Sequence, residues 1–572
     1  MPFSRSGARR ATLTRWLPGL VQLQEYPRGA LRSDIVAGTS VCVVMIPSVL
    51  AYAELVGVRP EAGLYAAIGA MLAYALLTSS RSVIVGPDTT IALLAGSIIA
   101  PLAAGDPVRA AMLAAALAMA TGVLLMLAGR LKLGNAADLL STPVLIGYAA
   151  GAALVLIGTQ LPALLGLALP RDPFFLRVVD AFAALRESHI PTVALGAGQI
   201  ALMLAIARYT PRVPGTVIGC GVAIAASLAF DLPYHGVAHL RPLPTGLPMP
   251  ALPSLEWRDL QALAPGAIAL ALLVFAEGVL LARTLAEKRG DTVNPDQELT
   301  ALGMANVAAS VVAGFPVGAS TSRSVTAEAA GVRTQLAQWI AVALLVAFVL
   351  VLAQWLVVLP RVALAAILIV AATRLIDLAQ LRTLFALDRR AFGLALAVAL
   401  GVLILGVLPG VLLGVGLSLA RVLLEVARPR DALLRRLPID RRFHDLTDDE
   451  GGLATPGVLV YRLYAPLIFA NARHVSDRLH ALAAEAVPAL RCLVLDLQAV
   501  THIDVTAFEV LRQWHDAFER AGIDVRFARA NRPLREQLNR WLPEVRAEAE
   551  RFFPSASAAV DDFLATHPTP PP

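Results

Sequence analysis

Two stretches decide the fold of this chain: Ser82–Pro87, which reads SVIVGP, and Val311–Pro316, which reads VVAGFP. Each is rich in β-branched residues, ends in a glycine and a proline, and is followed by a short apolar segment, at Thr89–Ala103 and from Val325 onward. A membrane chain interrupted at matching places in its two halves usually holds its substrate between two broken helices. Because backbone outside a helix needs hydrogen-bond partners inside a bilayer, we expect the two extended pieces to pair at mid-membrane.

The composition divides the chain into a membrane part and a soluble part. Of the 572 residues, 57% are hydrophobic and 16% are charged, with a mean hydropathy of +0.68; a soluble protein is about 25% charged. Residues Asp34–Val426 lie in or near apolar runs, whereas Ala427–Pro572 is charged throughout. The cysteines, at positions 42, 220 and 492, show no disulfide or metal-ligand spacing. We expect no cofactor and no metal.

Runs of about 20 apolar residues are long enough to cross a bilayer, and the chain offers seven candidate segments in each half when the short piece after each break is counted. The first half gives 34–54, 61–79, 88–103, 107–129, 138–165, 190–208 and 213–230. The second half gives 262–285, 296–314, 322–332, 335–358, 360–376, 388–406 and 408–426. The proline break lies 53 residues after Asp34 and 54 residues after Ala262. Because seven is odd, the second half enters the membrane from the opposite side, so we expect an α-helical polytopic protein whose 14 transmembrane segments form a 7+7 inverted repeat.

Arginine clusters flank the membrane part on both sides. They comprise Arg5, Arg9, Arg10, Arg15, Arg28 and Arg32 before it, and Arg421, Arg428, Arg430, Arg435, Arg436, Arg441 and Arg442 after it. Because positive flanks stay on the cytoplasmic side, we expect both termini in the cytoplasm and the chain in the cell's inner (plasma) membrane. The clusters adjoin lipid-embedded segments and have no interleaved aromatic residues, so we expect no nucleic-acid partner.

Strand and helix signals alternate in the soluble part, which predicts a small α/β domain. Strands are expected at Val458–Leu463, Arg491–Leu497 and Asp524–Ala528, and helices at Ala472–Ala484, Val505–Ala521 and Pro533–Trp541. The expected domain limits are a cytoplasmic N-terminal segment 1–33, a transmembrane domain 34–427 with repeats at about 34–230 and 262–427, a linker 428–449, the soluble domain 450–566 and a disordered tail 567–572.

The starts of the two short helices form the candidate site. A helix N-terminus exposes unpaired N–H groups and about half a positive charge, so two such ends facing each other make a site for an anion. The hydroxyls at these ends can donate to an oxyanion; they belong to Thr89, Thr90, Ser322 and Ser324. The alternative reading is that Asp88 and Ser322 simply cap their helices. Both readings can hold together.

Two charged residues lie in apolar surroundings, where a charge is costly and usually functional. Arg323 either serves the site or pairs with a carboxylate such as Glu328. Glu277 lies in the run LLVFAEG, and a buried carboxylate favours its neutral form. We therefore expect Glu277 to bind a coupling proton, with sodium less favoured; the alternative is a static pair with Arg323. Asp88 is protonated, turned away as a cap or coupled to a cation, and the sequence leaves these three readings open.

Three segments of the membrane part resemble the SulP family of anion permeases, the sulfate permease family that includes prestin and pendrin. They are IPSVLAYA at 46–53 with Gly63-Leu64-Tyr65, NPDQEL at 294–299 with Gly303, Asn306 and Phe315-Pro316, and SRS at 322–324 with Gly331 and Thr334-Gln335. The soluble part resembles a STAS domain through Leu495-Asp496 and Ile503-Asp504-Val505-Thr506.

The resemblance implies a core domain and a gate domain, a cytoplasmic STAS domain open to a protein partner, a substrate site between the third and tenth segments, and a homodimer. It implies that Arg323 makes the anion site positive and that Glu277 bears on cation coupling. Ser48 stands where many relatives have glutamine, and Tyr52 lies one turn away on the same face. We expect both to contact substrate, the alternative for Tyr52 being a packed residue with its hydroxyl bonded.

The resemblance also bears on regulation. Thr506 stands where single-domain STAS proteins carry a phosphorylated Ser or Thr, although Ala507 replaces the usual glycine. The alternative is that Thr506 is a first-turn residue of its helix without a regulatory role. Phosphorylation of Thr506 is therefore kept as a regulatory expectation.

These features predict a secondary active anion transporter, a proton-coupled symporter of sulfate or a similar small oxyanion that works by alternating access. A dicarboxylate or bicarbonate carrier of the same family is the alternative. A membrane-anchored STAS signalling scaffold is an alternative of a different class, and it predicts a protein partner without flux. An enzyme is not expected, because the chain has no nucleophile elbow and no Walker loop.

Overall fold

The computed structural model describes residues 17–24, 26–134, 141–167, 174–210, 214–242, 246–253, 256–437, 442–445, 453–541 and 552–567. The chain divides into two compact units, Met1–Ser418 and Leu419–Pro572. The expectations for residues 1–16 and 568–572 lie outside the described residues.

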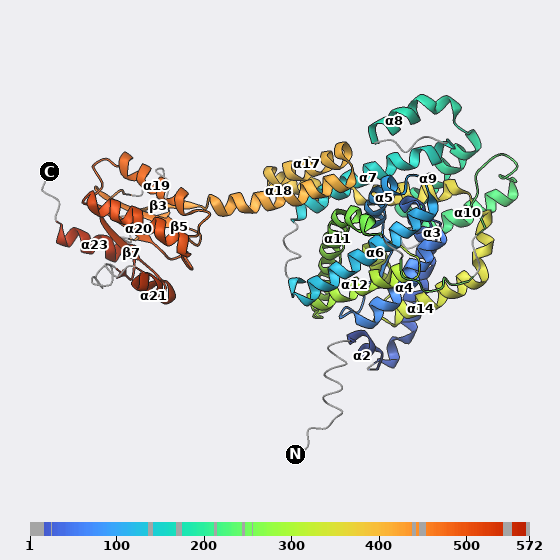
Figure 1. Ribbon diagram of the computed structural model, residues 1–572, viewed down its shortest axis with the longest axis horizontal. Helices are drawn as coiled ribbons and strands as arrows, with labels where there is room; N and C mark the ends of the chain where they lie inside the picture. The colour runs from blue at the N-terminus through green and yellow to red at the C-terminus, as the bar shows by residue number, and fades with distance from the viewer. Residues whose placement is uncertain are drawn as a thin grey trace, which may run out of the picture. The chain divides into compact units, whose positions relative to one another are not determined.

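After α2, one order of elements occurs twice, from α3 to α10 and again from α11 to α18 (Figure 1). The first half runs α2 (Pro18–Gln24), α3 (Leu31–Val56), α4 (Glu61–Leu77), β1 (Val85–Gly86), α5 (Thr89–Ala103), α6 (Pro107–Arg130), α7 (Thr142–Leu165), α8 (Phe174–Ala183), α9 (Ile190–Tyr209) and α10 (Gly215–Ala229). The second half runs α11 (Trp257–Arg289), α12 (Pro295–Val311), β2 (Gly318–Ala319), α13 (Thr321–Ala329), α14 (Leu336–Ala347), α15 (Arg361–Leu375), α16 (Leu378–Leu387), α17 (Arg389–Leu405) and α18 (Val407–Ala427). Helices α8 and α16 were not expected from the sequence.

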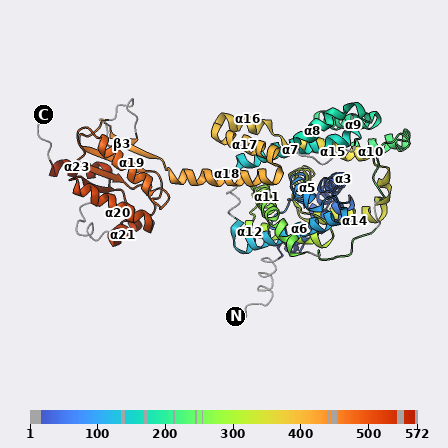
Figure 2. The same ribbon diagram turned by 45° about the horizontal axis from the view of Figure 1, so that its top comes forward.

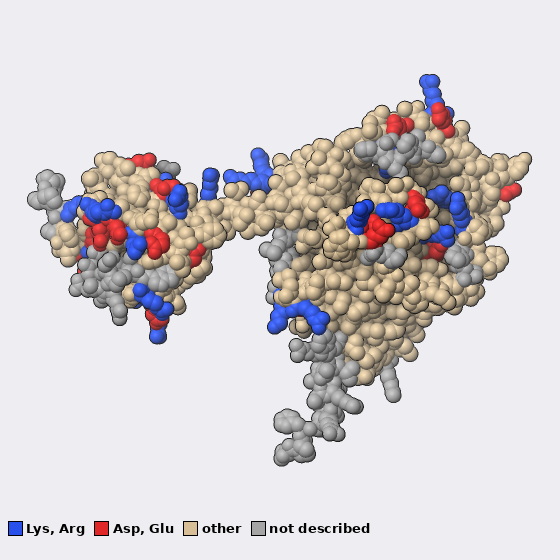
Figure 3. All heavy atoms as spheres, viewed as in Figure 1, with Lys and Arg blue, Asp and Glu red and all other residues tan. Residues whose placement is uncertain are grey.

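The first unit is a multi-pass membrane structure. Among the described residues, eight helices are long and apolar enough to cross a membrane. Large apolar side chains lie exposed on several of them, including Leu204 on α9 and Val123 on α6, as expected where lipid is the solvent. On the face shown in Figure 3, the charged side chains of this unit stand in a few small groups separated by uncharged surface. The count of 14 segments and the inverted relation of the halves stay predictions.

The first extended stretch pairs as expected, but its partner is not Val311–Pro316: the second strand, β2, lies just beyond that stretch. β1 pairs antiparallel with β2, joining Val85 to Ala319 and Gly86 to Gly318. Val311 instead ends α12, so the helix that precedes it overrides the β-branched preference of the stretch. The Asn306 side chain then fixes the turn into β2, because its amide donates to the Val317 carbonyl and accepts from the Val317 N–H.

Helix packing around the strand pair is close because small residues face one another. In both views α5 lies among α3, α6 and α11 (Figures 1 and 2). α6 contacts α12 at a reciprocal glycine pair: a Cβ on Gly122 would lie 2.6 Å from the Gly303 carbonyl oxygen, and a Cβ on Gly303 would lie 2.7 Å from that of Gly122. Such small-residue contacts let membrane helices approach at backbone distance.

A buried carboxylate ties the second half to the turn that leads into β1. Glu298, at the start of α12, is 1% exposed. It accepts hydrogen bonds from the Tyr74 hydroxyl (2.6 Å), the Thr78 hydroxyl (2.9 Å), the Ser79 hydroxyl and N–H (2.7 and 2.8 Å) and the Ser80 N–H (3.1 Å). Hydrogen bonds from protein donors therefore replace the water that this buried carboxylate has lost, and they hold the end of α4 in place.

We expect Glu298→Ala to lower the free energy of unfolding by about 3 kcal/mol or more, because several buried donors lose their acceptor together. The measurement is the thermal unfolding midpoint of the purified protein in detergent. Glu287→Ala is the matched control, since Glu287 is exposed on α11. Equal midpoints for the two variants would contradict the assigned role of Glu298.

The second unit contains a six-stranded mixed sheet in the order β4-β3-β5-β6-β7-β8. The strands are β3 (Asp431–Arg436), β4 (Phe443–Asp445), β5 (Val458–Leu463), β6 (Cys492–Asp496), β7 (Asp524–Ala528) and β8 (Phe552–Phe553). The helices are α19 (Ala472–Glu485), α20 (Val505–Arg520), α21 (Arg532–Trp541) and α23 (Ala556–Thr566).

Both faces of this sheet are covered. Alternate residues of β6 point to opposite sides: Leu493 packs in one hydrophobic cluster with α19, α20 and α21, and Val494 packs in another with α23. Strands β5 to β8 are parallel, and β3 is antiparallel to β5. The range 428–449, expected as a linker, thus contributes two strands to the sheet.

Candidate anion site

Each strand of the pair leads into one of the short helices, so both helix N-termini lie next to the strand pair. α5 begins three residues after β1, and α13 begins two residues after β2. Because the strands are antiparallel, the helices leave the pair at opposite ends, each with its N-terminus toward the strands. Asp88 and Ser320 hold the two N-cap positions in extended conformations, and neither side chain caps its helix. The backbone N–H groups at these two starts are thus left for another acceptor.

Arg323 reaches across from α13 to the segment in front of α5. The residue is 2% exposed, and its Nη2 donates to the Pro87 carbonyl at 2.6 Å. Its Nε is buried without a hydrogen-bond partner among the described residues. Gly86 leaves room for this guanidinium: it has φ +155°, and a Cβ there would lie 3.4 Å from Arg323 Nη2.

Glu277, Thr90 and Asp88 lie together at the start of α5. The Thr90 hydroxyl is 3.2 Å from Glu277 Oε2 and 3.5 Å from Asp88 Oδ2. Glu277 comes from α11, and both carboxylates are partly exposed. The hydroxyl donates to Glu277 at the shorter distance, and Asp88 lies at the limit of hydrogen bonding.

Helix α3 supplies the residues expected from the first segment. The Thr89 hydroxyl donates to the Tyr52 hydroxyl at 2.9 Å, which brings Tyr52 to the start of α5. Ser48 is buried one turn away, and its hydroxyl donates to the Val44 carbonyl of its own helix at 3.1 Å. Tyr52 is therefore in contact with the α5 start, whereas the Ser48 hydroxyl is engaged by backbone.

The two serines of α13 take different positions. Ser324 is fully buried and its hydroxyl accepts from the Ile84 N–H at 2.9 Å, so it holds the strand before α5. Ser322 is exposed. It lies within the helix rather than at its cap, because α13 begins at Thr321. The capping alternative thus fails for Ser322, and Asp88 occupies a cap position without making the capping bond.

The pairing alternatives for Arg323 are also not seen. Glu328 pairs with Arg289 at 2.8 Å. Among the described residues, which include all four side chains, no ion pair joins Arg323 to Glu328 or to Glu277. The guanidinium is held by a neutral carbonyl, and its charge is not cancelled by a directly bonded carboxylate.

Three residues that were not expected to belong to the site position it; of these, only Gln335 was named in the sequence, as part of the family resemblance. Tyr148 on α7 donates to the Thr90 carbonyl at 3.0 Å. Gln338 on α14 accepts from the Val85 N–H at 3.2 Å, and Gln335 donates to the Val83 carbonyl at 3.1 Å. Each is a polar side chain in or beside an apolar run, and this signal was available in the sequence.

In the second unit, Asp496 at the end of β6 has a fully buried carboxylate that Arg462 and Arg529 contact. Burial is the largest single influence on the pKa of Arg462 and lowers it, but the hydrogen bonds and charge interactions with Asp496 and Tyr464 together outweigh burial, and the pKa is raised. Thr506 is exposed in the first turn of α20. Asp504 caps this helix, because its side chain accepts a hydrogen bond from the Ala507 N–H at 2.7 Å. Phosphorylation of Thr506 stays a prediction.

Comparison with known proteins identifies the family of the chain. The model of the sulfate permease family matches residues 31–398, and that of the STAS domain matches residues 453–541. A probable sulfate transporter of Mycobacterium tuberculosis is 40% identical over 552 residues, covering 96% of this chain and 99% of that protein. Sulfate anion transporter 1 of Homo sapiens is 28% identical over 650 residues, covering 98% and 92%.

Solved structures show the same fold. Murine solute carrier 26 family member A9 in the inward-facing state superposes with a TM-score of 0.89 at 21% identity, covering 97% of this chain and 95% of that chain. The transmembrane domain of the cyanobacterial bicarbonate transporter BicA gives 0.61 at 23% identity, covering 68% and 98%. The relatives are transporters and not enzymes. A match over most of the membrane unit, a second match to the STAS unit and a relative aligned along almost its whole length together place this chain in the sulfate permease family of anion transporters.

Proposed function

We propose that this chain is a secondary active carrier that moves sulfate or a similar small oxyanion together with protons. The observation that carries the proposal is the Arg323 guanidinium, buried between two uncapped helix starts and not paired with a carboxylate. Such a position favours an anion through backbone N–H groups, helix dipoles and a cation at once. The printed name of the 40% identical relative supports sulfate over other anions.

Glu277 is the proposed coupling group, with Asp88 as its neighbour across Thr90. Two carboxylates near an anion site repel the anion unless a cation joins them. A proton on Glu277 removes one negative charge, and the oxyanion then enters at lower cost. The proton must leave before the empty site can load again from the other side. We favour the proton over sodium.

Transport proceeds in this proposal by alternating access. The core consists of α3 to α6 and α11 to α14, and it moves against a gate of α7, α9, α10, α15, α17 and α18. Rocking about a site near mid-membrane is the expected motion of inverted-repeat carriers. The protein works as a homodimer in the cell's inner (plasma) membrane, with both termini and the STAS domain in the cytoplasm, where the STAS domain is available to a protein partner.

The test is uptake of labelled sulfate, fumarate and bicarbonate into proteoliposomes, with and without an inward proton gradient and with the membrane potential clamped. We expect saturable sulfate uptake that the gradient drives uphill, since each pH unit supplies about 1.4 kcal/mol per proton. Uptake of fumarate or bicarbonate without sulfate would replace sulfate by that alternative. Equal uptake of all three regardless of the gradient would refute the coupling.

A further inference from the structure

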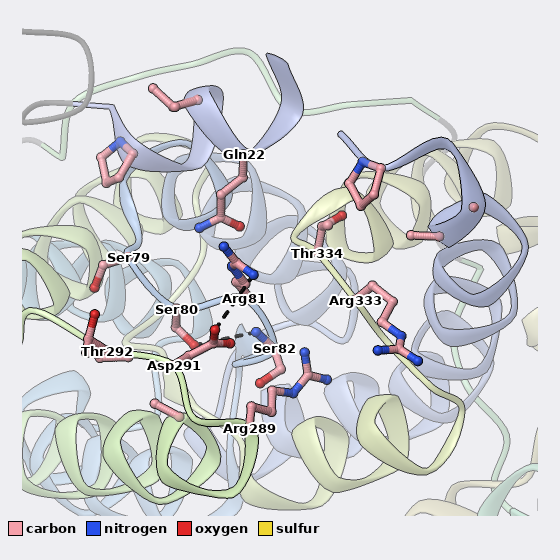
Figure 4. Close-up of a pocket in the computed structure, with 17 residues that line it drawn as sticks. Gln22, Ser79, Ser80, Arg81, Ser82, Arg289, Asp291, Thr292, Arg333 and Thr334 are labelled. Carbon is pink, nitrogen blue, oxygen red and sulfur yellow. Dashed lines mark hydrogen bonds and ion pairs between the residues drawn. The ribbon is translucent and has the colours of Figure 1, made fainter. Parts of the chain in front are cut away.

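A polar cavity lies in the first unit, and none of the residues of the candidate anion site line it. Its volume is about 690 Å³, within the range of small-molecule pockets, which is about 300 to 1,000 Å³. Segments from both halves line it: α2 and the turn before α3, the 79–82 turn, the end of α11 with the turn after it, and the turn after α13. Figure 4 shows the lining side chains converging on one space.

The cavity is rich in guanidinium groups. Arg81, Arg289 and Arg333 line it, against one lining carboxylate, Asp291. Arg81 and Asp291 are only loosely paired, at 3.7 Å. Arg289 pairs with Glu328, outside the lining, and also donates to the Val332 carbonyl. Three arginines from three separate segments leave the cavity with an excess of positive charge.

Arg333 is the arginine without a protein partner. Its backbone N–H donates to Asp34 at 2.7 Å, which anchors the residue. Its exposed guanidinium makes no ion pair or hydrogen bond with any residue that the structure describes. In Figure 4 the guanidinium groups of Arg289 and Arg333 both turn into the cavity. The planar fork of Arg333, with the charge of Arg289 in the wall of the same cavity, is suited to the oxygens of a phosphate group.

The rest of the lining fits an organic group attached to that phosphate. Gln22 points into the cavity from α2, and its Oε1 is buried without a hydrogen-bond partner among the described residues. This oxygen can accept from a ligand hydroxyl. Apolar atoms of Pro18, Val21 and Val293 form another part of the wall. A bare inorganic anion leaves the amide oxygen and these atoms unused.

We propose that this cavity binds a hydroxyl-bearing phosphate ester, either a soluble one or the headgroup of an anionic phospholipid. The guanidinium groups of Arg333 and Arg289 hold the phosphate, and Gln22 accepts from a hydroxyl. The site adjoins transport directly, because the 79–82 turn runs into β1 and Thr334 follows α13. A ligand in this cavity contacts both the 79–82 turn, which precedes β1 and α5, and the turn that follows α13.

The test measures binding of glycerol 3-phosphate to the full chain in detergent by calorimetry. We expect Arg333→Ala to weaken binding about tenfold or more, because a charge-assisted contact is lost. Arg186→Ala is the matched control, since Arg186 is exposed elsewhere on the same unit and removes the same charge. Arg323→Ala, which disables the proposed transport site, is expected to leave this binding unchanged.

Nanodiscs distinguish the two sources of phosphate. Stabilisation by soluble glycerol 3-phosphate in phosphatidylcholine nanodiscs assigns a soluble ester. An Arg333-dependent rise in the unfolding midpoint only when phosphatidylglycerol replaces phosphatidylcholine assigns a lipid headgroup. Ligand effects that are identical in wild type and Arg333→Ala, in both arms, overturn the proposal. Loss of binding in Arg323→Ala alone also overturns it, since the phosphate then occupies the transport site.

Discussion

Arg323→Ala is expected to reduce saturable uptake about 100-fold, to the level of empty liposomes, because truncating a buried charge that faces an opposite charge costs several kcal/mol of binding. Arg323 is the only charged side chain bonded to the segment between β1 and α5 in the described part of the site. Without it, two helix N-termini and a few hydroxyls remain, and each of these is a weaker attraction. Arg323→Lys keeps the charge but not the planar fork, so we expect a small residual uptake.

Arg323→Ala also removes the donor to the Pro87 carbonyl, so folding must be measured beside transport. The control is Arg186→Ala, which removes an exposed arginine of the same unit and is expected to transport normally. Both variants are compared by membrane insertion, elution profile and unfolding midpoint. Saturable uptake by a folded Arg323→Ala protein would show that the anion is held elsewhere.

Glu277→Gln is expected to abolish gradient-driven accumulation while exchange of anion across the membrane continues. The amide keeps the shape of the side chain and can still contact the Thr90 hydroxyl, but it cannot take up and release a proton. The substituted site therefore resembles the protonated state permanently. Counterflow of labelled anion against unlabelled anion measures exchange, and uptake under an imposed proton gradient measures accumulation.

The matched control for this variant is Glu287→Gln, an exposed glutamate on the same helix. We expect the control to accumulate anion as the wild type does. Persistent accumulation by Glu277→Gln would remove Glu277 from the coupling step. Loss of exchange as well as accumulation would mean that Glu277 is needed for anion binding itself, with no separate role in coupling.

The breaks in the chain were readable because they depend on local chemistry. Gly86-Pro87 and Gly314-Phe315-Pro316 cannot continue a helix, so the short helices and the strand between the long ones could be expected from residue types alone. The position of β2 could not, because Val311 and Val312 favour a strand locally, but Val311 ends α12 and Val312 follows it in a turn. In the STAS domain, β5 and β7 have the residue ranges that the sequence predicted for them. β3 was not predicted, and it is defined by its antiparallel pairing with β5.

The candidate site shows the same division. Arg323 and Glu277 stand out in the sequence because a charge in an apolar run needs a reason. Their partners do not: Arg323 bonds Pro87, 236 residues away, and Glu277 bonds Thr90, 187 residues away. Glu328 looked like a partner for Arg323 because it is near in sequence, but helix geometry turns it to Arg289 instead. Tertiary contacts of this length carry no local signature.

The contacts between the two halves at β1 and β2 have a consequence for biosynthesis. The Ile84 N–H is bonded by Ser324, 240 residues further along the chain. While a ribosome makes those residues, β1 and the start of α5 are already in or near the bilayer with their backbone groups unmatched. Until Ser324 and β2 have been made, the first half therefore lacks the bonding partners that the finished protein gives to Ile84 and β1.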